Sequence, residues 1–236
     1  MRIEILYFEG CPHAQEADTL VRNVARRLAP DALIERINVA TEEEAARMHF
    51  LGSPSVRIDG CDLEGKRTDN GALACRTYDG GSGVPPEWLV EAALLRALRP
   101  KGLLFLCVAN SARSQMAEGI ARSLAPPDVA IWSAGSNPSS VRPEAIEVLR
   151  EIGVDISGQR SKHVSEIPAD RVDTVITLCA EEECPVFLGK ALRVHWGLPD
   201  PAAVRGADEG LAAFRAVRDE LQRRIAVIFH TAGTRE

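Results

Sequence analysis

The chain has 236 residues, of which 45% are hydrophobic and 26% charged, the proportions of a soluble globular protein with a substantial core. Its 28 basic and 34 acidic residues give a formal net charge of −6, which argues against a nucleic-acid partner or a basic membrane-binding face. No apolar run approaches the roughly 20 residues that span a bilayer, and the first residues do not resemble a signal peptide. We therefore expect a cytoplasmic protein without membrane or nucleic-acid partners, whose six cysteines are mostly reduced thiols.

One pattern occurs twice along the chain: a short apolar strand, a turn that carries a cysteine, and an amphipathic helix. Its predicted elements are a strand at 3–8 and a helix over about 13–28, then a strand at 102–106 and a helix over about 114–124. Between the two copies, a helix near 87–98 is stopped by Arg99-Pro100 before the second strand begins. We therefore expect two domains, 1–99 and 100–236.

Strands and helices continue to alternate in the second half. The predicted strands are 129–133, 172–178 and 192–195, and the predicted helices are 143–152 and about 208–228. This alternation predicts an α/β fold with a mostly parallel sheet covered on both faces. Right-handed crossovers would then place the loop after the first strand at the carboxyl edge of the sheet, where such folds bind ligands.

That loop has a cysteine and an arginine separated by five mostly small residues. It consists of Cys107, Val108, Ala109, Asn110, Ser111, Ala112, Arg113 and Ser114. Small residues allow the backbone N–H groups to turn inward, and the following helix adds its positive N-terminal end, so the loop is suited to hold a tetrahedral oxyanion. Arg113 would clamp two of its oxygens, while the thiolate of Cys107 would attack from below. The alternative is a buried structural cysteine beside a surface arginine.

A wider set of motifs resembles the thioredoxin-coupled arsenate reductases, relatives of the low-molecular-weight tyrosine phosphatases. The matching segments are Asn110-Ser111-Ala112-Arg113-Ser114-Gln115-Met116-Ala117-Glu118, Ser133-Ala134-Gly135-Ser136, Ser161-Lys162-His163, 173–179, Glu183-Cys184-Pro185 and 195–201. The resemblance covers 103–228 and implies a phosphatase-like parallel-sheet α/β sandwich. Two features depart from the family pattern: Ala112 replaces a cysteine that many members carry, and the interval between Cys179 and Cys184 is short.

The resemblance also implies a reaction, the reduction of arsenate to arsenite by three thiols. Cys107 is then the nucleophile, Asp200 protonates the departing oxygen, and Cys179 followed by Cys184 resolve the intermediate by disulfide exchange. The implied partners are arsenate, with phosphate or sulfate as competing oxyanions, and a reductant that is thioredoxin or a small thiol; no cofactor or resident metal is required. In some relatives the counterpart of Glu118 takes part in a cation site. A Cys179–Cys184 disulfide would require 180–183 to form a loop, because a helix would hold the two cysteines too far apart.

Two other functions remain open. A low-molecular-weight protein tyrosine phosphatase would use Cys107, Arg113 and Asp200 and leave Cys179 and Cys184 idle. A thiol-based arsenite sensor would bind the metalloid through its cysteines without turnover. Thiol oxidation that depends on arsenate distinguishes the reductase from both alternatives.

The N-terminal half resembles thioredoxin-like proteins at two loops. Gly10-Cys11-Pro12-His13-Ala14 is similar to their active-site turn, and Gly52-Ser53-Pro54-Ser55-Val56 is similar to their cis-proline loop. Ala14 replaces the second cysteine of the usual pair, so Cys11 needs either Cys61 or Cys75 as a resolving partner, or a small thiol. We hypothesise that Cys11 is a reactive thiol that relays electrons to the Cys179–Cys184 disulfide; a redox-inactive docking fold is the alternative.

Overall fold

The computed structural model describes residues 1–67, 70–180, 187 and 189–230. Its contacts divide the chain into two compact units, Met1–Arg99 with His230, and Pro100–Phe229. None of the helices in the described part of the chain is both long and apolar enough to cross a membrane.

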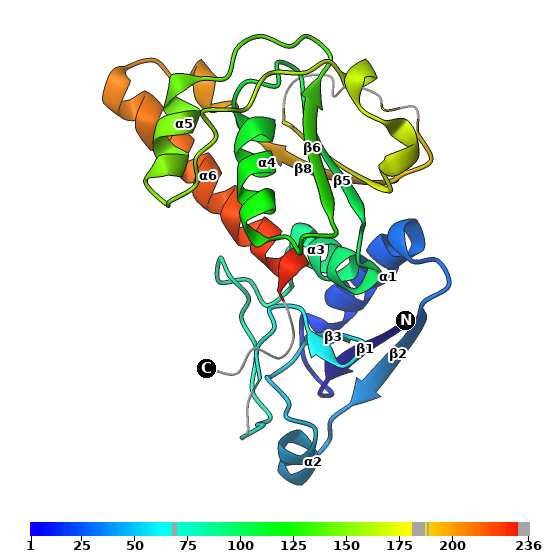
Figure 1. Ribbon diagram of the computed structural model, residues 1–236. Helices are drawn as coiled ribbons and strands as arrows, with labels where there is room; N and C mark the ends of the chain where they lie inside the picture. The colour runs from blue at the N-terminus through cyan, green and yellow to red at the C-terminus, as the bar shows by residue number, and fades with distance from the viewer. Residues whose placement is uncertain (68–69, 181–186, 188, 231–236) are drawn as a thin grey trace. The chain divides into compact units, whose positions relative to one another are not determined.

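The first unit is a four-stranded mixed sheet with three helices (Figure 1). Its elements are β1 (Arg2–Tyr7), α1 (Ala14–Leu28), β2 (Leu33–Asn38), α2 (Glu42–Arg47), β3 (Ser55–Ile58), β4 (Cys61–Asp62) and α3 (Glu87–Leu98). The strand order is β2-β1-β3-β4, in which β1 runs parallel to β2 and antiparallel to β3, and β3 is antiparallel to β4. The predicted strand and the two predicted helices are present. β2, α2, β3 and β4 lie outside the elements predicted from the sequence.

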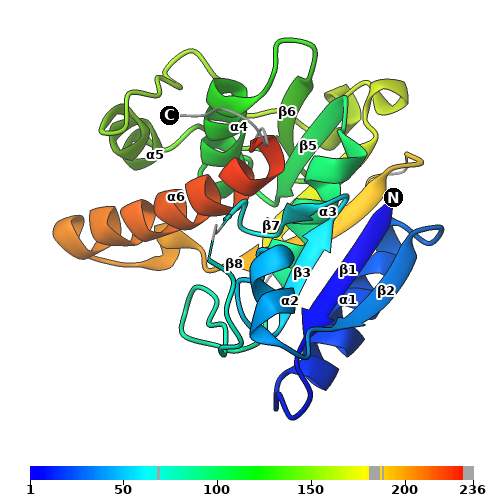
Figure 2. The same ribbon diagram turned by 90° about the horizontal axis from the view of Figure 1, so that it is seen from below.

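The two faces of this sheet are covered by different helices. Figure 2 shows α1 and α2 on opposite sides of β1 and β3. The buried face of α1 repeats at helical spacing through Ala17, Val21, Val24 and Leu28. Arg27 joins α1 to α3 through Glu91, at 2.9 Å between Nη2 and Oε1. The Ser53–Pro54 peptide bond that precedes β3 is cis.

The second unit is a four-stranded parallel sheet, as predicted for this half of the chain. Its elements are β5 (Gly102–Cys107), α4 (Arg113–Leu124), β6 (Ala130–Gly135), α5 (Pro143–Arg150), η1 (Val164–Glu166), η2 (Ala169–Arg171), β7 (Thr174–Cys179), β8 (Leu192–Leu198), η3 (Pro201–Ala203) and α6 (Ala207–Phe229). The order is β6-β5-β7-β8. In Figure 1, α4, α5 and α6 gather on one side of this sheet, and the segment with η1 and η2 lies on the other.

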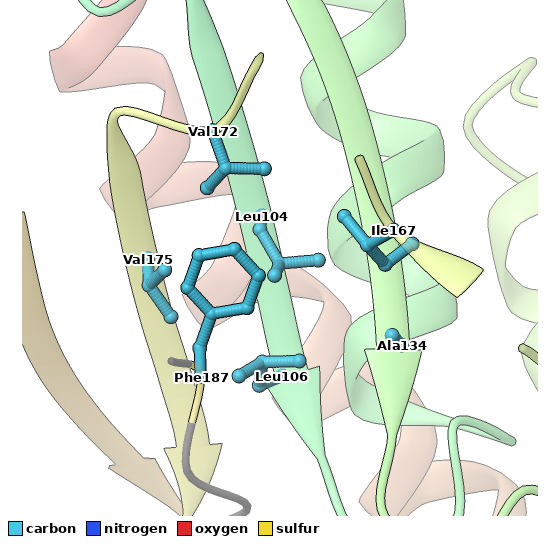
Figure 3. Close-up of a cluster of buried hydrophobic side chains, with 7 residues drawn as sticks. All are labelled: Leu104, Leu106, Ala134, Ile167, Val172, Val175 and Phe187. Carbon is cyan, nitrogen blue, oxygen red and sulfur yellow. The ribbon is translucent and has the colours of Figure 1, made fainter. Parts of the chain in front are cut away.

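The central strand β5 is buried along its whole length. Leu104 and Leu106 point into the cluster drawn in Figure 3, together with Ala134, Ile167, Val172, Val175 and Phe187. Leu103 and Phe105 alternate with them and are fully buried on the other face. Apolar packing on both faces therefore holds the carboxyl end of β5, where Cys107 lies, in a fixed position.

Candidate active site

The loop between β5 and α4 turns its carbonyl groups outward. The carbonyl oxygens of Val108, Ala109 and Ser111 accept backbone hydrogen bonds at 2.9–3.0 Å from Asn137, Ser139 and Arg142, respectively. In a planar trans peptide the following N–H points the opposite way, so the N–H groups of residues 109, 110 and 112 face the interior of the loop. These inward donors form a cradle for an anion.

Asn110 holds the loop in shape from its middle. Its φ of 45° is in the left-handed region, which Asn tolerates better than most residues. Its side-chain amide donates to Ser114 Oγ at 2.8 Å and to Ser133 Oγ at 2.9 Å. Its side-chain oxygen accepts from the backbone of Lys162 at 2.7 Å. The strained residue is thus fixed on both sides by buried partners.

The thiol of Cys107 receives two polar contacts inside this loop. Ser114 Oγ lies 2.9 Å from Cys107 Sγ, and the N–H of Asn110 donates to the same sulfur at 3.2 Å. Cys107 is 3% exposed and is the last residue of the buried strand β5. These contacts hold Cys107 Sγ inside the loop, next to the inward N–H groups.

Arg113 and Asp200 meet at the edge of the loop. Arg113 is the first residue of α4 and is 4% exposed. Its Nη1 donates to the carbonyl of Leu198 at 3.0 Å, and its Nη2 lies 3.5 Å from Asp200 Oδ1. The carboxylate of Asp200 is more accessible, with 37% of its side chain exposed. The structure therefore brings together the predicted clamp and the predicted acid, which are 87 residues apart in the sequence.

A buried polar layer supports the loop from the side of α4. Gln115 donates to both oxygens of Asn110 and to the carbonyl of Arg160. Glu118, 1% exposed, accepts from Ser133 Oγ and from Lys162 Nζ, the latter at 3.1 Å. Two cationic side chains lie beside Glu118: the guanidinium of Arg122, with 2.6 Å between Nη2 and Oε1, and the ammonium of Lys162. Among the residues that the structure describes, no group of three His, Cys, Asp or Glu side chains could hold a metal ion.

Gly135 permits a close approach between β6 and the loop. A Cβ at this position would lie 2.2 Å from the carbonyl oxygen of Val108 and 2.9 Å from the nitrogen of Asn110. Both contacts are with backbone atoms, which cannot move aside as a flexible side chain would. The loop geometry therefore requires glycine here.

The second predicted cysteine lies at the end of the neighbouring strand. Leu106 of β5 pairs with Thr177 of β7, so Cys107 and Cys179 both stand at the carboxyl ends of adjacent parallel strands. Cys179 is 1% exposed. The third, Cys184, and the predicted loop at 180–183 fall in or reach into 181–186, outside the described residues.

In the first unit, Cys11 lines a cavity of about 400 Å³ at the carboxyl ends of β1 and β2. Polar residues in its wall are Tyr7, Glu9, Gln15, Arg36 and Asn38. Arg36 donates to Gln15 Oε1 at 3.3 Å, and its guanidinium lies 4.5 Å from the centre of the Tyr7 ring. The partly exposed cysteine therefore lines a cavity whose wall carries one acidic and one basic side chain, Glu9 and Arg36.

Residues 102–234 match the family model of the low molecular weight phosphotyrosine protein phosphatases. This match covers more than half of the chain. The chain belongs to this family. It is 41% identical to the arsenate reductase of Halalkalibacterium halodurans over 137 residues, which are 57% of this chain and 99% of that protein. It is 39% identical to the arsenate reductase of Bacillus subtilis over 128 residues, 53% of this chain and 92% of that protein.

Among solved structures, an arsenate reductase in oxidized state is 36% identical, with a TM-score of 0.48 over 55% of this chain and 96% of the other. The family match begins at residue 102 and covers nearly all of the second unit, which therefore carries the membership of the phosphatase family.

Sequence reasoning did not assign a role to Gln115, Ser133, Ser161 or Lys162, although all four lie in the quoted motifs. Each bonds to Asn110 or to its supporting partners; Ser161 Oγ, for example, donates to the Asn110 carbonyl at 2.6 Å. The sequence feature that could have identified these four residues is that they are polar and lie in or beside strands and helices that are otherwise apolar.

Proposed function

We propose that this protein reduces arsenate to arsenite with Cys107 as nucleophile and with Cys179 and then Cys184 as resolving thiols. The observation that carries the proposal is that Cys107 and Cys179 lie at the ends of adjacent parallel strands. Cys107 lies inside the loop that is suited to hold an oxyanion. The 41% and 39% identical relatives are both arsenate reductases over nearly their full lengths. The site is suited to anions of tetrahedral shape, so phosphate and sulfate compete with arsenate.

The first step uses groups that already meet at the loop. The inward N–H groups and the guanidinium of Arg113 hold three arsenate oxygens. The thiolate of Cys107 attacks arsenic, an As–S bond forms, and one As–O bond breaks. Asp200 donates its proton to the departing oxygen, which leaves as water. Arsenic is still in the +5 state at this point, and no electron has been transferred.

Reduction occurs when a second thiol attacks the first. The Cys179 thiolate attacks Cys107 Sγ, and the S–As bond breaks with its electron pair going to arsenic. Arsenite, with arsenic in the +3 state, departs and a Cys107–Cys179 disulfide remains. Cys184 then attacks Cys179, which frees Cys107 and transfers the disulfide to Cys179–Cys184. An external dithiol, of the thioredoxin class or a pair of small thiols, returns the two electrons.

The register of β7 places a demand on this sequence of steps. Val175 points into the cluster of Figure 3, but the pairing of β7 with β8 shifts its register between Thr177 and Cys179. Cys107 alternates with Leu106 and so points to the other face, toward α4. The irregular end of β7 is therefore the segment that sets the approach of Cys179 Sγ to Cys107 Sγ. The resolving step, rather than oxyanion binding, is where we expect the conformational change.

We assign the first unit a thioredoxin-like fold and a role in electron delivery through Cys11. The assignment is supported by a parallel β1–β2 pair, the antiparallel β3 and β4, and a cis proline directly before β3. The cavity beside Cys11 gives an incoming thiol or disulfide access to the sulfur. A Cys11→Ser enzyme that turns over as fast as wild type with the same reductant contradicts this role.

The decisive experiment measures arsenite formation and thiol consumption with thioredoxin and its reductase, for wild type and for Cys107→Ser, Cys179→Ser and Cys184→Ser. If the protein is an arsenate reductase, each of these three substitutions should abolish turnover. Cys61→Ser is the matched control and should turn over as wild type does. If only Cys107 matters and an aryl phosphate is hydrolysed instead, the chain is a phosphatase. Stoichiometric arsenite binding without turnover identifies a sensor.

A further inference from the structure

The first unit contains three cysteines, and the sheet separates one of them from the other two. Cys61 pairs with Ile58, and Ile58 pairs with Ile3 at the beginning of β1. Cys11 follows the other end of that strand, after Tyr7. The four residue steps from Ile3 to Tyr7 span about 13 Å at the rise of a strand. Cys61 therefore lies at the end of the sheet opposite to Cys11.

Cys75 lies at the same end of the sheet as Cys11. It forms a parallel bridge with Ser53, in which the Ser53 N–H donates to the Ala74 carbonyl at 2.8 Å and the Arg76 N–H donates to the Ser53 carbonyl at 3.0 Å. On its other side, Ser53 Oγ accepts a hydrogen bond from the Phe8 N–H at 3.3 Å. One residue of the cis-proline loop thus separates Cys75 from the segment that leads to Cys11.

The neighbour of Cys75 anchors this arrangement in the protein interior. Arg76 is 5% exposed and binds Asp62 through two hydrogen bonds, at 2.6 and 2.9 Å. It also donates to Glu64 at 2.7 Å and to Ser55 Oγ at 3.0 Å. Because a buried charge without its partners is costly, these contacts fix the backbone at residue 76 and leave the side chain of Cys75 exposed.

We propose that Cys75 is the resolving thiol of Cys11, so that the two form a second redox couple in place of the missing cysteine at Ala14. This inference rests on the proposed electron delivery through Cys11. The Cys11 thiolate attacks the Cys179–Cys184 disulfide; one S–S bond breaks, a mixed disulfide forms, and a thiolate leaves. Cys75 then attacks Cys11 Sγ, which releases the second thiolate. Two electrons reach Cys179 and Cys184, and a Cys11–Cys75 disulfide remains for an external thiol to reduce.

Closing the bond requires a local movement. Two strand spacings across Ser53 place Cys75 about 10 Å from Phe8, and Cys11 follows Phe8 by three residues, whereas a disulfide holds its Cα atoms about 4.4–6.8 Å apart. The turn that carries Cys11 is the segment free to close this gap. Its backbone hydrogen bonds are long, 3.2 Å from Cys11 N to Phe8 O and 3.4 Å from Ala14 N to Cys11 O. Gly10, in the left-handed region, has open space where a Cβ would be.

The test oxidises the full-length protein with oxidised glutathione, blocks remaining thiols with iodoacetamide and maps disulfides by mass spectrometry. Trypsin places the three cysteines on separate peptides, because Arg57, Lys66 and Arg76 lie between or beside them. We expect a peptide pair joined through Cys11 and Cys75 in wild type and in the matched control Cys61→Ser. In Cys75→Ser, a glutathione adduct on Cys11 should persist about ten-fold longer or more, because an intramolecular thiol acts at an effective concentration of about 1 mM or above.

A Cys11–Cys61 pair overturns the proposal, as does a glutathione adduct on Cys11 that decays equally fast in wild type and Cys75→Ser. The wild-type peptide map decides the pairing even if Cys75→Ser does not fold. Arsenite formation by the wild type with dithiothreitol is measured separately. Its failure removes the proposed reductase function, whereas a missing Cys11–Cys75 peptide removes only this couple.

Discussion

Replacing Gly135 with alanine tests whether the loop geometry controls catalysis. The added Cβ would lie 2.2 Å from the carbonyl oxygen of Val108, whereas an ordinary contact begins at 3.4 Å. The loop must therefore retreat by about 1 Å, and a displacement of that size at reacting groups costs roughly 100-fold in rate. Strain against backbone atoms should also reduce stability by about 1–3 kcal/mol, a fall in Tm of roughly 3–10 °C.

The assay compares kcat/KM for arsenite formation with Tm, and Gly158→Ala is the matched control. Gly158 lies in the same unit and has no atom within 4 Å of an added Cβ, so it should behave as wild type in both measurements. Activity is recorded well below Tm, so that a stability loss does not reduce the folded fraction. Wild-type kcat/KM in Gly135→Ala would refute the argument that this contact sets the position of the oxyanion loop.

Three further outcomes follow from single contacts. Arg113→Lys keeps the charge but loses the planar fork that reaches Leu198 and Asp200, so kcat/KM for arsenate should fall about 10²–10³-fold in steady-state kinetics; an unchanged value contradicts the clamp. Ser114→Ala removes the hydroxyl that lies 2.9 Å from Cys107 Sγ. It should slow the alkylation of that thiol by iodoacetamide about five- to ten-fold at pH 7. The control is Ser123→Ala, because Ser123 lies farther along α4 and donates its hydrogen bond to the Ile120 carbonyl. The hydrogen bonds of Glu151 with Arg215, and then with Arg218, lower the pKa of Glu151 from 4.5 to about 2, so the stability that this carboxylate contributes is complete above pH 4.5 and is lost as pH falls through about 2. Tm of wild type should therefore exceed that of Glu151→Gln at pH 7, with the difference shrinking toward pH 2, and a pH-independent difference would exclude this ion pair as its cause.

The strands and helices of the second unit were predictable because each carries one dominant pattern. β5 is apolar at nearly every position, and the actual bounds of the predicted elements differ from the predicted ones by a few residues at most. β2 escaped prediction because Glu35 and Arg36 interrupt its apolar residues and its burial is mixed. β3 and β4 are short, with four and two residues, and hydrogen bonding to neighbouring strands defines them more than their own composition does.

The site was predictable in its chemistry but not in its support. Cysteine, arginine and a downstream aspartate are reactive types whose spacing carries meaning, and the structure brings Cys107, Arg113 and Asp200 to one place. Gln115 and Ser133 are ordinary polar residues in a helix and a strand, and nothing local marks them as buried. Their function depends on Asn110 adopting a left-handed conformation between them, which is a property of the folded loop.

The loop by itself does not determine which reaction follows. A cysteine under a bound oxyanion forms the same kind of adduct with phosphate or arsenate, and water can hydrolyse a phosphate adduct without electrons. Arsenate reduction needs a thiol to reach Cys107 Sγ, and the parallel pairing of β5 with β7 delivers Cys179 to the same end of the sheet. The approach of Cys179 to Cys107 Sγ from the irregular end of β7 is therefore the physical difference that we propose between reduction and hydrolysis.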